Sequence, residues 1–317
     1  MFKKSIKGKK ILVTGGAGAI GTNLVSVLLK NEAKEIYVID NLSSGRAHTL
    51  LEHDKVNFFQ KDIIDNEILE KIFDKGIDIV FHLAAHFANQ NSVDYPERDL
   101  LTNVYGTVKL LRQSHKKGVK RFVYFNTSCM YSPEHGIFKE DSKEFQYDTP
   151  YSISKHTGEL YSELFNEYYG LPTVGVRIFN SYGPHEYPGL YRNVIPNFFK
   201  RAMDGQALTV MGTGEETRSF TYVDDIVRGV MLAATKEGVI GEVFNIGSDR
   251  EIKIIDLAKK INKVTGNTVP IEFIPRRDWD KTMRRCADLS KAKDLLGYET
   301  TVDIDDGLER TFKWFKL

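Results

Sequence analysis

Short apolar runs alternate with segments of helical spacing through the first part of the chain. The apolar runs cover residues 9–15, 35–40, 56–62, 77–85, 121–128 and 171–180, and apolar residues recur every three or four positions at 19–30, 66–75, 100–117 and 149–170. Near-continuous apolar strands are typical of a parallel sheet that is covered on both faces. Helices that alternate with the strands supply that cover. The pattern therefore predicts an α/β fold with a doubly wound parallel sheet.

The pattern changes after about residue 180. Glycine and proline gather at 181–189, strands shorten, and helical spacing appears at 194–204, 223–235, 254–265 and 289–296. We therefore expect residues 1–180 to form the larger domain and residues 181–317 to form mainly a smaller C-terminal α/β lobe. Residues 220–250 are expected to return in part to the large domain, because the VFNIG run at 243–247 is apolar enough to join its sheet.

Composition and charge exclude several classes of protein. The 317 residues carry 44 basic and 43 acidic side chains, and this balance argues against a nucleic-acid partner. No run approaches the roughly 18 apolar residues of a membrane span, and the N-terminal lysines are not followed by the apolar core of a signal peptide. The two cysteines, Cys129 and Cys286, cannot build a disulfide framework and lack metal-binding spacing. We expect a cytoplasmic protein without a metal site.

A glycine-rich turn follows the first predicted strand. The VTGGAGAIG run at 13–21 opens a predicted helix, and Asp40 closes the next strand 19 residues beyond Gly21. Glycines let the main chain approach a pyrophosphate, whose negative charge is favoured at a helix N-terminus. An acid in the place of Asp40 hydrogen-bonds ribose hydroxyls and repels a 2′-phosphate. The segment therefore predicts a Rossmann-type NAD site, and Arg46, slightly downstream, keeps NADP open.

A tyrosine and a lysine lie four residues apart in YSISK, at 151–155, just after Pro150. This spacing places Tyr151 and Lys155 on one face of a helix. A phenol with a pKa of about 10 needs a shift of roughly three units, or about 4 kcal/mol, to act as a base near pH 7. A lysine ammonium and the positive ring of NAD⁺ both stabilise a phenolate. The same spacing is common on ordinary amphipathic helices. The pair indicates a catalytic site because it occurs together with the glycine turn and with NTS at 126–128.

Taken in order, the motifs resemble those of the extended short-chain dehydrogenase/reductases that modify nucleotide-sugars, the group that includes UDP-glucose 4-epimerases. They are VTGGAGAIG, DNLSSG (40–45), FHLAA (81–85), NVYG (103–106), YSISK, RIFNSYGP (177–184), RSFTYVDD (218–225) and ADLSKAKDLLGY (287–298). The resemblance implies tightly bound NAD, a nucleotide-diphosphate sugar as substrate, and oxidation of the sugar at C4.

The resemblance also assigns roles to single residues. Tyr151 takes the proton from the sugar O4 as hydride leaves C4, Lys155 binds the nicotinamide ribose and tunes Tyr151, and Thr127 hydrogen-bonds O4. The implied cofactor contacts are Gly15, Gly18, Ala19, Ile20, Gly21, Asp40, Asn41, Ser44, Gly45, Asp62, Ile63, Leu83, Ala84, Ala85, Asn103, Tyr151, Lys155 and Tyr182. The implied substrate contacts are His86, Phe87, Asn89, Thr127, Ser128, Asn180, Asn193, Arg218 and Arg277.

Cys129 distinguishes between the reactions of this group. The chain has the triplet Thr127-Ser128-Cys129. At this position 4,6-dehydratases share Thr-Asp-Glu, and glucuronate decarboxylases share Thr-Ser-Glu. The missing acids argue against dehydration and, less decisively, against decarboxylation. A small residue here is usual in 4-epimerases, in which the 4-keto sugar rotates and the hydride returns to the other face. A 4-epimerase is therefore the first hypothesis.

Two other reactions stay open. The triplet is similar to the Ser-Ala-Cys of GDP-mannose 3,5-epimerase, whose cysteine is a base, so Cys129 is also a candidate catalytic residue. A thiol needs nearby positive charge for that role, which the sequence does not show. That chemistry also needs an acid, for which His185 would replace a lysine that the chain lacks. A net 4-dehydrogenase would use the same residues but release the 4-keto sugar with NADH left bound.

The sugar, the nucleotide and the assembly are less closely defined. Phe87 stands where typical 4-epimerases have lysine, and residues 274–292 are rich in arginine, which puts galactose in doubt and leaves open GDP-linked sugars such as heptoses. One or two of Arg276, Arg277, Arg284 and Arg285 are expected to bind the diphosphate, and the others to pair with Asp278 and Asp280. We expect a homodimer in which helices 100–117 and 151–169 pair as a four-helix bundle. A non-enzymatic NAD-binding protein is the rival hypothesis, against which the retention of Thr127, Tyr151 and Lys155 argues.

Overall fold

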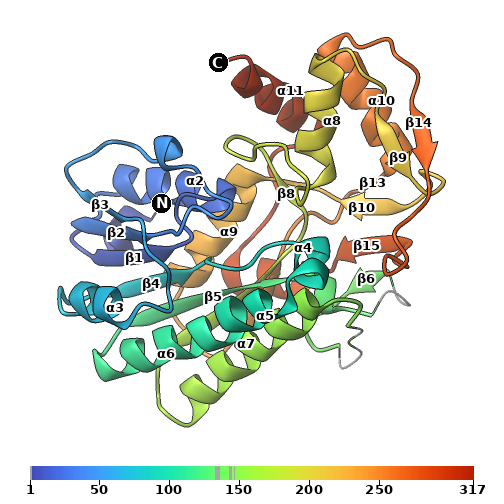
Figure 1. The fold of residues 1–317 in the computed structure, drawn as a ribbon. Coiled ribbons are helices and arrows are strands. Elements are labelled where there is room, and N and C mark those ends of the chain that lie inside the picture. The colour runs from blue at the N-terminus through green and yellow to red at the C-terminus, as the bar shows by residue number, and fades with distance from the viewer. Residues whose placement is uncertain (1, 133–135, 143–144, 146) are drawn as a thin grey trace.

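The central element of the computed structural model is a parallel sheet of seven strands (Figure 1). The structure describes residues 2–132, 136–142, 145 and 147–317. The strand order is β12-β7-β5-β4-β1-β2-β3. The strands are β1 (Lys10–Thr14), β2 (Glu35–Ile39), β3 (Val56–Phe59), β4 (Ile79–His82), β5 (Arg121–Thr127), β7 (Thr173–Ile178) and β12 (Val243–Ile246). Every apolar run that was predicted to join this sheet contains one of its strands. The predicted α/β fold is therefore confirmed.

Helices cover both faces of the sheet, as the continuous apolar strands require. One face carries α2 (Ala19–Lys30) and α9 (Val223–Thr235), and the other carries α3 (Asn66–Phe73), α6 (Thr107–Lys116) and α7 (Pro150–Glu167). Successive residues of β1 point to opposite faces, so that Ile11 joins the first layer and Leu12 the second. Both side chains are fully buried.

The helix expected at 100–117 starts earlier and is less regular than its pattern indicates. It begins as α5 (Pro96–Asp99), continues through η2 (Leu100–Gly106), whose turns are π-helical, and ends as α6. Such wide turns are rare and often accompany functional sites. Here they lie beside α7, the helix that carries Tyr151 and Lys155.

A smaller lobe stands over the ends of the sheet strands (Figure 1). Its helices are α8 (Val194–Met203), α10 (Ile254–Thr265) and α11 (Ile304–Phe315). Its strands are β13 (Glu251–Lys253), β10 (Thr217–Ser219), β15 (Arg284–Ala287) and β6 (Ile137–Phe138) in one sheet, and the pairs β9 (Thr209–Met211) with β14 (Glu272–Ile274) and β8 (Ser181–Tyr182) with β11 (Thr221–Tyr222). The lobe core consists mainly of aromatic and aliphatic side chains from the three helices.

The chain passes between the two parts in both directions. VFNIG, which the pattern places in the large sheet, forms β12 and pairs with β7. In the other direction, β6 lies within the first 180 residues but pairs with β15 of the lobe sheet. The short elements α1 (Lys3–Ile6), η1 (Ala47–Thr49), α4 (Asn89–Asp94), η3 (Ser128–Met130) and η4 (Ala292–Leu296) complete the described structure. Among all the residues that the structure describes, no helix is long and apolar enough to cross a bilayer.

A buried ion pair ties α7 to the sheet. Arg177 of β7 donates from Nη2 to Glu159 Oε1 at 2.6 Å and from Nε to Glu159 Oε2 at 3.1 Å. Asn126 of β5 donates to the same carboxylate at 2.7 Å. Both members of the pair are almost completely buried. Because buried charges are tolerated only with full hydrogen bonding, this network fixes the position of α7 against β5 and β7.

Candidate active site

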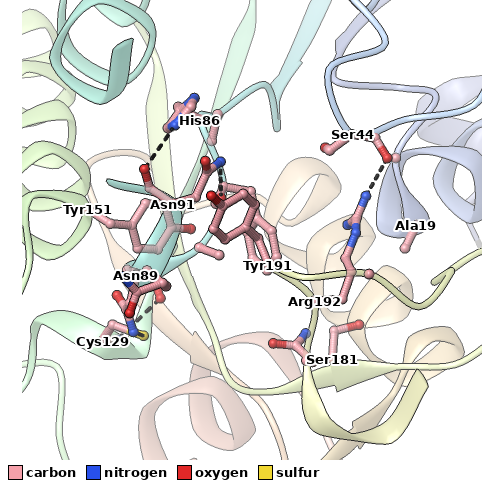
Figure 2. Close-up of a pocket in the computed structure, with 18 of the residues that line it drawn as sticks. Ala19, Ser44, His86, Asn89, Asn91, Cys129, Tyr151, Ser181, Tyr191 and Arg192 are labelled. Carbon is pink, nitrogen blue, oxygen red and sulfur yellow. Dashed lines mark hydrogen bonds between the residues drawn. The ribbon is translucent and has the colours of Figure 1, made fainter. Parts of the chain in front are cut away.

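A cavity of about 1360 Å³ lies between the carboxyl ends of the sheet strands and the lobe. From β1 the strand order runs in one direction to β3, and from β4 it runs in the other direction to β12. The cavity lies at this switch point between β1 and β4, where doubly wound folds bind ligands. Every residue proposed from the sequence as catalytic or substrate-binding lines it, and so do all the proposed cofactor contacts except Gly45, Asn103 and Tyr182. Figure 2 shows Tyr151, Asn89 and Cys129 toward one end of this cavity and Ala19 and Ser44 toward the other.

The glycine turn fits a pyrophosphate by shape as well as by sequence. Gly15 has a φ of +70°, and a Cβ atom there would lie 2.7 Å from the main-chain nitrogen of Ala84. A Cβ atom on Gly21 would lie 2.4 Å from the carbonyl oxygen of Gly15. No side chain caps the first turn of α2, which leaves its N–H groups facing the cavity. The turn can therefore receive an anionic group directly on its main chain.

The acid after β2 is held in place by the main chain. Asp40 accepts hydrogen bonds from the N–H groups of Ala17 at 3.0 Å and Leu42 at 2.8 Å. Burial raises the pKa of Asp40, and these hydrogen bonds oppose that rise. Arg46, which keeps NADP open in the sequence, instead lies 4.0 Å from the ring centre of Tyr187 and does not line the large cavity. The arrangement fits the two ribose hydroxyls of NAD.

Asp62 lies beside the same part of the cavity. Its carboxylate accepts from the side chain of Asn41 at 2.8 Å and from the N–H group of Ile64 at 3.1 Å. Ile63, the next residue, is buried and lines the wall. The two loops that follow β2 and β3 are therefore joined at the cavity edge by a side-chain hydrogen bond.

Tyr151 and Lys155 lie on the buried side of α7, as their spacing predicts. Burial raises the pKa of Tyr151, as would the charge of an ionised Cys129 and as does that of Asp99, while a hydrogen bond with Thr127 lowers it. The ring of Phe87 packs edge-on against Tyr151 with ring centres 6.2 Å apart. Tyr151 is therefore a neutral phenol, in contact with Thr127, until further positive charge reaches it.

Lys155 is buried in the cavity wall. Its ammonium lies 4.6 Å from the ring centre of Tyr124, whose hydroxyl donates to the main-chain oxygen of Lys155 at 2.8 Å. Burial lowers the pKa of Lys155 to about 8, and the charges of Asp99 and Glu159 oppose this change. Lys155 is thus mostly charged at neutral pH, in a position to act on groups bound in the cavity.

Cys129 has positive charge beside it that the sequence did not reveal. Nη1 of Arg285 lies 3.5 Å from Sγ of Cys129, and Nδ2 of Asn89 lies 3.6 Å from the same sulfur. Asn89 is itself held by Thr149, whose hydroxyl donates to Asn89 Oδ1 at 2.9 Å. Arg285 is one of the four arginines from which the sequence predicts one or two diphosphate ligands. Its place beside Cys129 was not predicted, because strand pairing rather than a local motif brings it here.

Three proposed cofactor contacts do not lie in the cavity wall. Asn103 is buried behind it, where it accepts from the N–H group of His86 at 2.8 Å and donates to Ser154 and Asp99. Tyr182 is 2% exposed and packs in the lobe core. Gly45 lines a smaller adjoining pocket. Asn103 can therefore only support the wall, because its polar atoms already bond protein groups.

The loop between β8 and α8 contributes two further cavity residues that the sequence analysis did not propose. Glu186 is buried, its Oε1 accepts from Asn193 at 2.7 Å, and burial raises its pKa to about 7. Arg192 donates to the main-chain oxygen of Ser44, across the cavity (Figure 2). His185, considered as an acid, instead packs against Trp314 with ring centres 5.4 Å apart and does not line the cavity.

Comparison with known proteins agrees with this geometry. Residues 11–247 match the NAD dependent epimerase/dehydratase family. An epimerase of Methanothermobacter thermautotrophicus is 44% identical with a TM-score of 0.94, over 99% of this chain and 94% of that one. The UDP-glucose 4-epimerase of Thermotoga maritima, solved with UDP-glucose, is 36% identical with a TM-score of 0.91, over 97% and 98%. The UDP-glucuronate 4-epimerase of Thermodesulfobacterium geofontis is 33% identical over 96% and 95%.

The family match covers three quarters of the chain, and the similar proteins extend over nearly all of it. The resemblance inferred from the motifs is therefore confirmed, as is the expected NAD cofactor. The chain belongs to the NAD-dependent epimerase/dehydratase family and is an NAD-dependent enzyme that modifies nucleotide-sugars.

Proposed function

We propose that the protein is a nucleotide-sugar 4-epimerase. The observation that carries the proposal is the convergence of Thr127, Tyr151 and Lys155 on one cavity whose wall has Ser128 and Cys129 where an eliminating acid would be needed. These residues suffice to move a proton at O4 but offer no carboxylate at the 128–129 position. The similarity to the Thermotoga maritima UDP-glucose 4-epimerase supports the same reaction.

In this proposal the sugar O4 lies between Tyr151 and Thr127. NAD supplies the hydride acceptor at C4 and, after the sugar has turned, the donor to its other face. Thr127 donates to O4 and orients it, and Tyr151 accepts its proton as the ketone forms. Lys155 and the positive charge of the oxidised cofactor lower the pKa of Tyr151, opposing the rise that burial causes. Tyr151 returns the proton to O4 when the ketone is reduced.

The two parts of the molecule divide the work of binding. We propose that the large sheet holds NAD through the glycine turn and Asp40, and that the lobe holds the nucleotide diphosphate through Arg218 and Arg277. Both arginines line the cavity. Arg277 is available for this role, because its guanidinium stacks on Trp279 and has no carboxylate partner among the described residues. Planar guanidinium groups bind phosphates in bidentate geometry.

A panel of UDP- and GDP-sugars in D₂O tests the proposal. Product NMR is expected to show two C4 epimers interconverting without deuterium in the carbon skeleton, because the transferred hydrogen comes from C4 itself. Stoichiometric NADH with release of a 4-keto sugar would instead identify a net 4-dehydrogenase. The absence of both epimerisation and NADH formation with every sugar would refute the proposed activity.

A second reaction has one observation in its favour. Arg285 supplies Cys129 with the neighbouring positive charge that a thiolate base at C3 or C5 would need. The position of His185 against Trp314 counts against it, because the expected acid is turned away from the cavity. Deuterium entering C3 or C5 in the parent enzyme, and no longer entering in Cys129→Ala, would establish 3,5-epimerisation.

We also propose a homodimer. Apolar side chains of η2 and α7 remain exposed, although the other faces of these helices are buried: Leu100, Leu101, Tyr105, Ile153, Leu160, Tyr161, Leu164 and Tyr168. The two helices pack side by side, so these residues form one surface. Contiguous exposed apolar patches mark interaction sites, and a second copy would bury this one as a four-helix bundle.

A further inference from the structure

Arg285 enters the cavity from the lobe sheet. In the parallel pairing of β10 and β15, Arg285 is the register partner of Arg218, so both side chains leave the sheet on the same side. Both line the cavity. Arg284, one residue earlier, points to the opposite side, where it binds the carboxylate of Glu251 in bidentate fashion. Strand β15 thus directs Arg285 into the cavity, while the hydrogen bonds of Arg284 to Glu251 lie outside it.

The donors of Arg285 are incompletely used. Its Nη2 donates to Thr282 Oγ1 at 3.2 Å, its Nη1 faces the sulfur of Cys129, and its buried Nε has no hydrogen-bond partner in the described part of the chain. No carboxylate of the described residues forms an ion pair with it. A buried guanidinium donor without an acceptor is costly, and a bound anion would relieve that cost.

The neighbouring arginine differs in this respect. Arg218 donates to the main-chain oxygens of Thr217 and Thr282, each at 2.8 Å, and has Asp280 at 3.8 Å. Burial and the charge of Arg285 lower the pKa of Arg218 to about 10. The cavity wall therefore concentrates positive charge at this point, and Arg285, unlike Arg218, has no carboxylate of the described residues beside it.

Arg285 also lies at the sugar end of the site. It contacts Cys129, whose N–H group donates to the hydroxyl of Thr127, the residue that hydrogen-bonds Tyr151, and the proposed function places Tyr151 at O4 of the sugar. In a hexuronic acid the carboxylate carbon is C6. C6 is attached to C5, which is the ring neighbour of C4. A guanidinium beside the C4 site can reach that group, whereas the diphosphate lies at the opposite end of the sugar.

We propose that the substrate is a nucleotide-activated hexuronic acid whose C6 carboxylate binds Arg285. The inference rests on the proposed function and names the class of sugar that this site takes. The carboxylate would accept hydrogen bonds from the guanidinium group of Arg285, whose Nη1 now faces Cys129. Arg285 is thereby a specificity-determining residue, and Cys129 is the small neighbour that leaves room for the carboxylate.

The same contact would protect the oxidised sugar. A 4-keto hexuronic acid is a β-keto acid: its C5–C6 bond can break, its electron pair passes to the enolate at C4 and C5, CO₂ leaves, and C5 takes up a proton. This reaction withdraws negative charge from the carboxylate. Arg285 stabilises the charge where it is and so favours the intact acid over the transition state for decarboxylation.

Matched sugar pairs and matched variants test the proposal. The parent enzyme is assayed with UDP-glucose against UDP-glucuronate and with GDP-mannose against GDP-mannuronate, and kcat/KM is compared within each pair. At least one acid is expected to exceed its neutral partner by roughly 30-fold or more, the loss typical of an unpaired buried charge. Arg285→Met should abolish that ratio, Arg285→Lys should keep part of it, and Arg284→Met should leave it unchanged.

The outcomes separate this inference from the proposed function. In Arg285→Met, retained activity on a neutral sugar and retained NAD show that the fold and the C4 chemistry are intact, and residual turnover of the acid should yield more of the decarboxylated pentose. A parent enzyme that prefers neutral sugars, or an acid preference that survives Arg285→Met, overturns the inference while the epimerase proposal stands. No epimerisation or NADH formation with either pair or with the wider panel overturns both.

Discussion

At the scale of single residues, Tyr151 depends on charge that arrives with other groups. Burial and the charges of an ionised Cys129 and of Asp99 raise its pKa above the ordinary value, and a hydrogen bond with Thr127 works in the other direction. In the proposed mechanism the phenol therefore ionises only when the positive charge of the oxidised cofactor is beside it. Proton removal would then be limited to the cofactor-bound site.

Tyr151→Phe tests that role. The variant keeps the ring that packs against Phe87 and loses only the hydroxyl, so we expect kcat to fall by about 10²–10⁴-fold with little change in thermal stability. Steady-state kinetics and a melting curve measure the two effects. Tyr147→Phe is the control, because Tyr147 bonds His156 away from the cavity wall. Unchanged turnover in Tyr151→Phe would contradict its assignment as the base.

His82 supports the floor of the cofactor site through a chain of hydrogen bonds. Its ring nitrogens lie 2.8 Å from the hydroxyls of Thr14 and Thr107. The hydroxyl of Thr107 donates to the Asn103 carbonyl at 2.6 Å, and Oγ1 of Thr14 accepts from Ala84 at 3.2 Å. Thr14 therefore donates to Nδ1 and the neutral ring donates from Nε2. Complete burial holds the pKa of His82 well below its usual value.

This neutral histidine predicts an acid-sensitive fold. Below about pH 6.5 the unfolded chain binds a proton on His82, whereas the folded protein keeps His82 neutral. The neutral His82 therefore does not reduce the free energy of unfolding above that pH, and reduces it increasingly as the pH falls. The free energy of unfolding, measured with urea between about pH 5 and 8, should fall toward the acid end. The slope should shrink in His82→Gln but not in His48→Gln, whose ring is exposed. Equal slopes in the two variants would contradict the prediction.

At the scale of elements, the turn between β1 and α2 must be free of side chains for two separate reasons. Gly15 needs a left-handed conformation, and its α-carbon faces the main chain that follows β4. The first reason is local and can be read from a glycine-rich turn. The second depends on the neighbouring strand, which pairs with β1 in register.

Two glycine variants separate these reasons. Gly15→Ala and Gly76→Ala both place alanine at positive φ, +70° and +78°, but only the Cβ atom at residue 15 would meet neighbouring atoms, at 2.7 Å. We expect each to lose roughly 1–3 kcal/mol through backbone strain, and Gly15→Ala alone to lose bound NAD as well. Urea unfolding and the NAD content of the purified protein measure the two effects. Full NAD content in Gly15→Ala would contradict the close-approach argument.

At the scale of the whole molecule, the exposed apolar surface of η2 and α7 predicts the assembly. The Leu164 side chain lies in this surface and is 46% exposed. Leu164→Glu places a charge there without disturbing the core, so light scattering should find a monomer where the parent is a dimer. Leu295→Glu, at an apolar residue with 44% exposure in η4, is the control and should remain dimeric. A monomeric parent would refute the dimer.

Most of the large domain could be predicted from the sequence because its signals are local. The helices at 19–30 and 223–235, and 254–265 in the lobe, have the bounds that their spacing predicts, since apolar period and flanking turns act within a few residues. α11 and the short strands of the lobe sheet were not predicted. β6, β10 and β15 contain two to four residues each and are strands only because distant segments pair with them.

The sequence by itself determined the parallel sheet, the glycine turn before α2, the place of Asp40, and the helical pair Tyr151 and Lys155, because each depends on spacing within one segment. Only the tertiary structure decided which arginine lies beside Cys129, that His185 turns away from the cavity, and that Asn103 and Tyr182 do not line it. These outcomes depend on contacts between residues far apart in the chain, such as the 156 positions between Cys129 and Arg285. No local pattern encodes such a contact, since strand pairing and lobe packing create it.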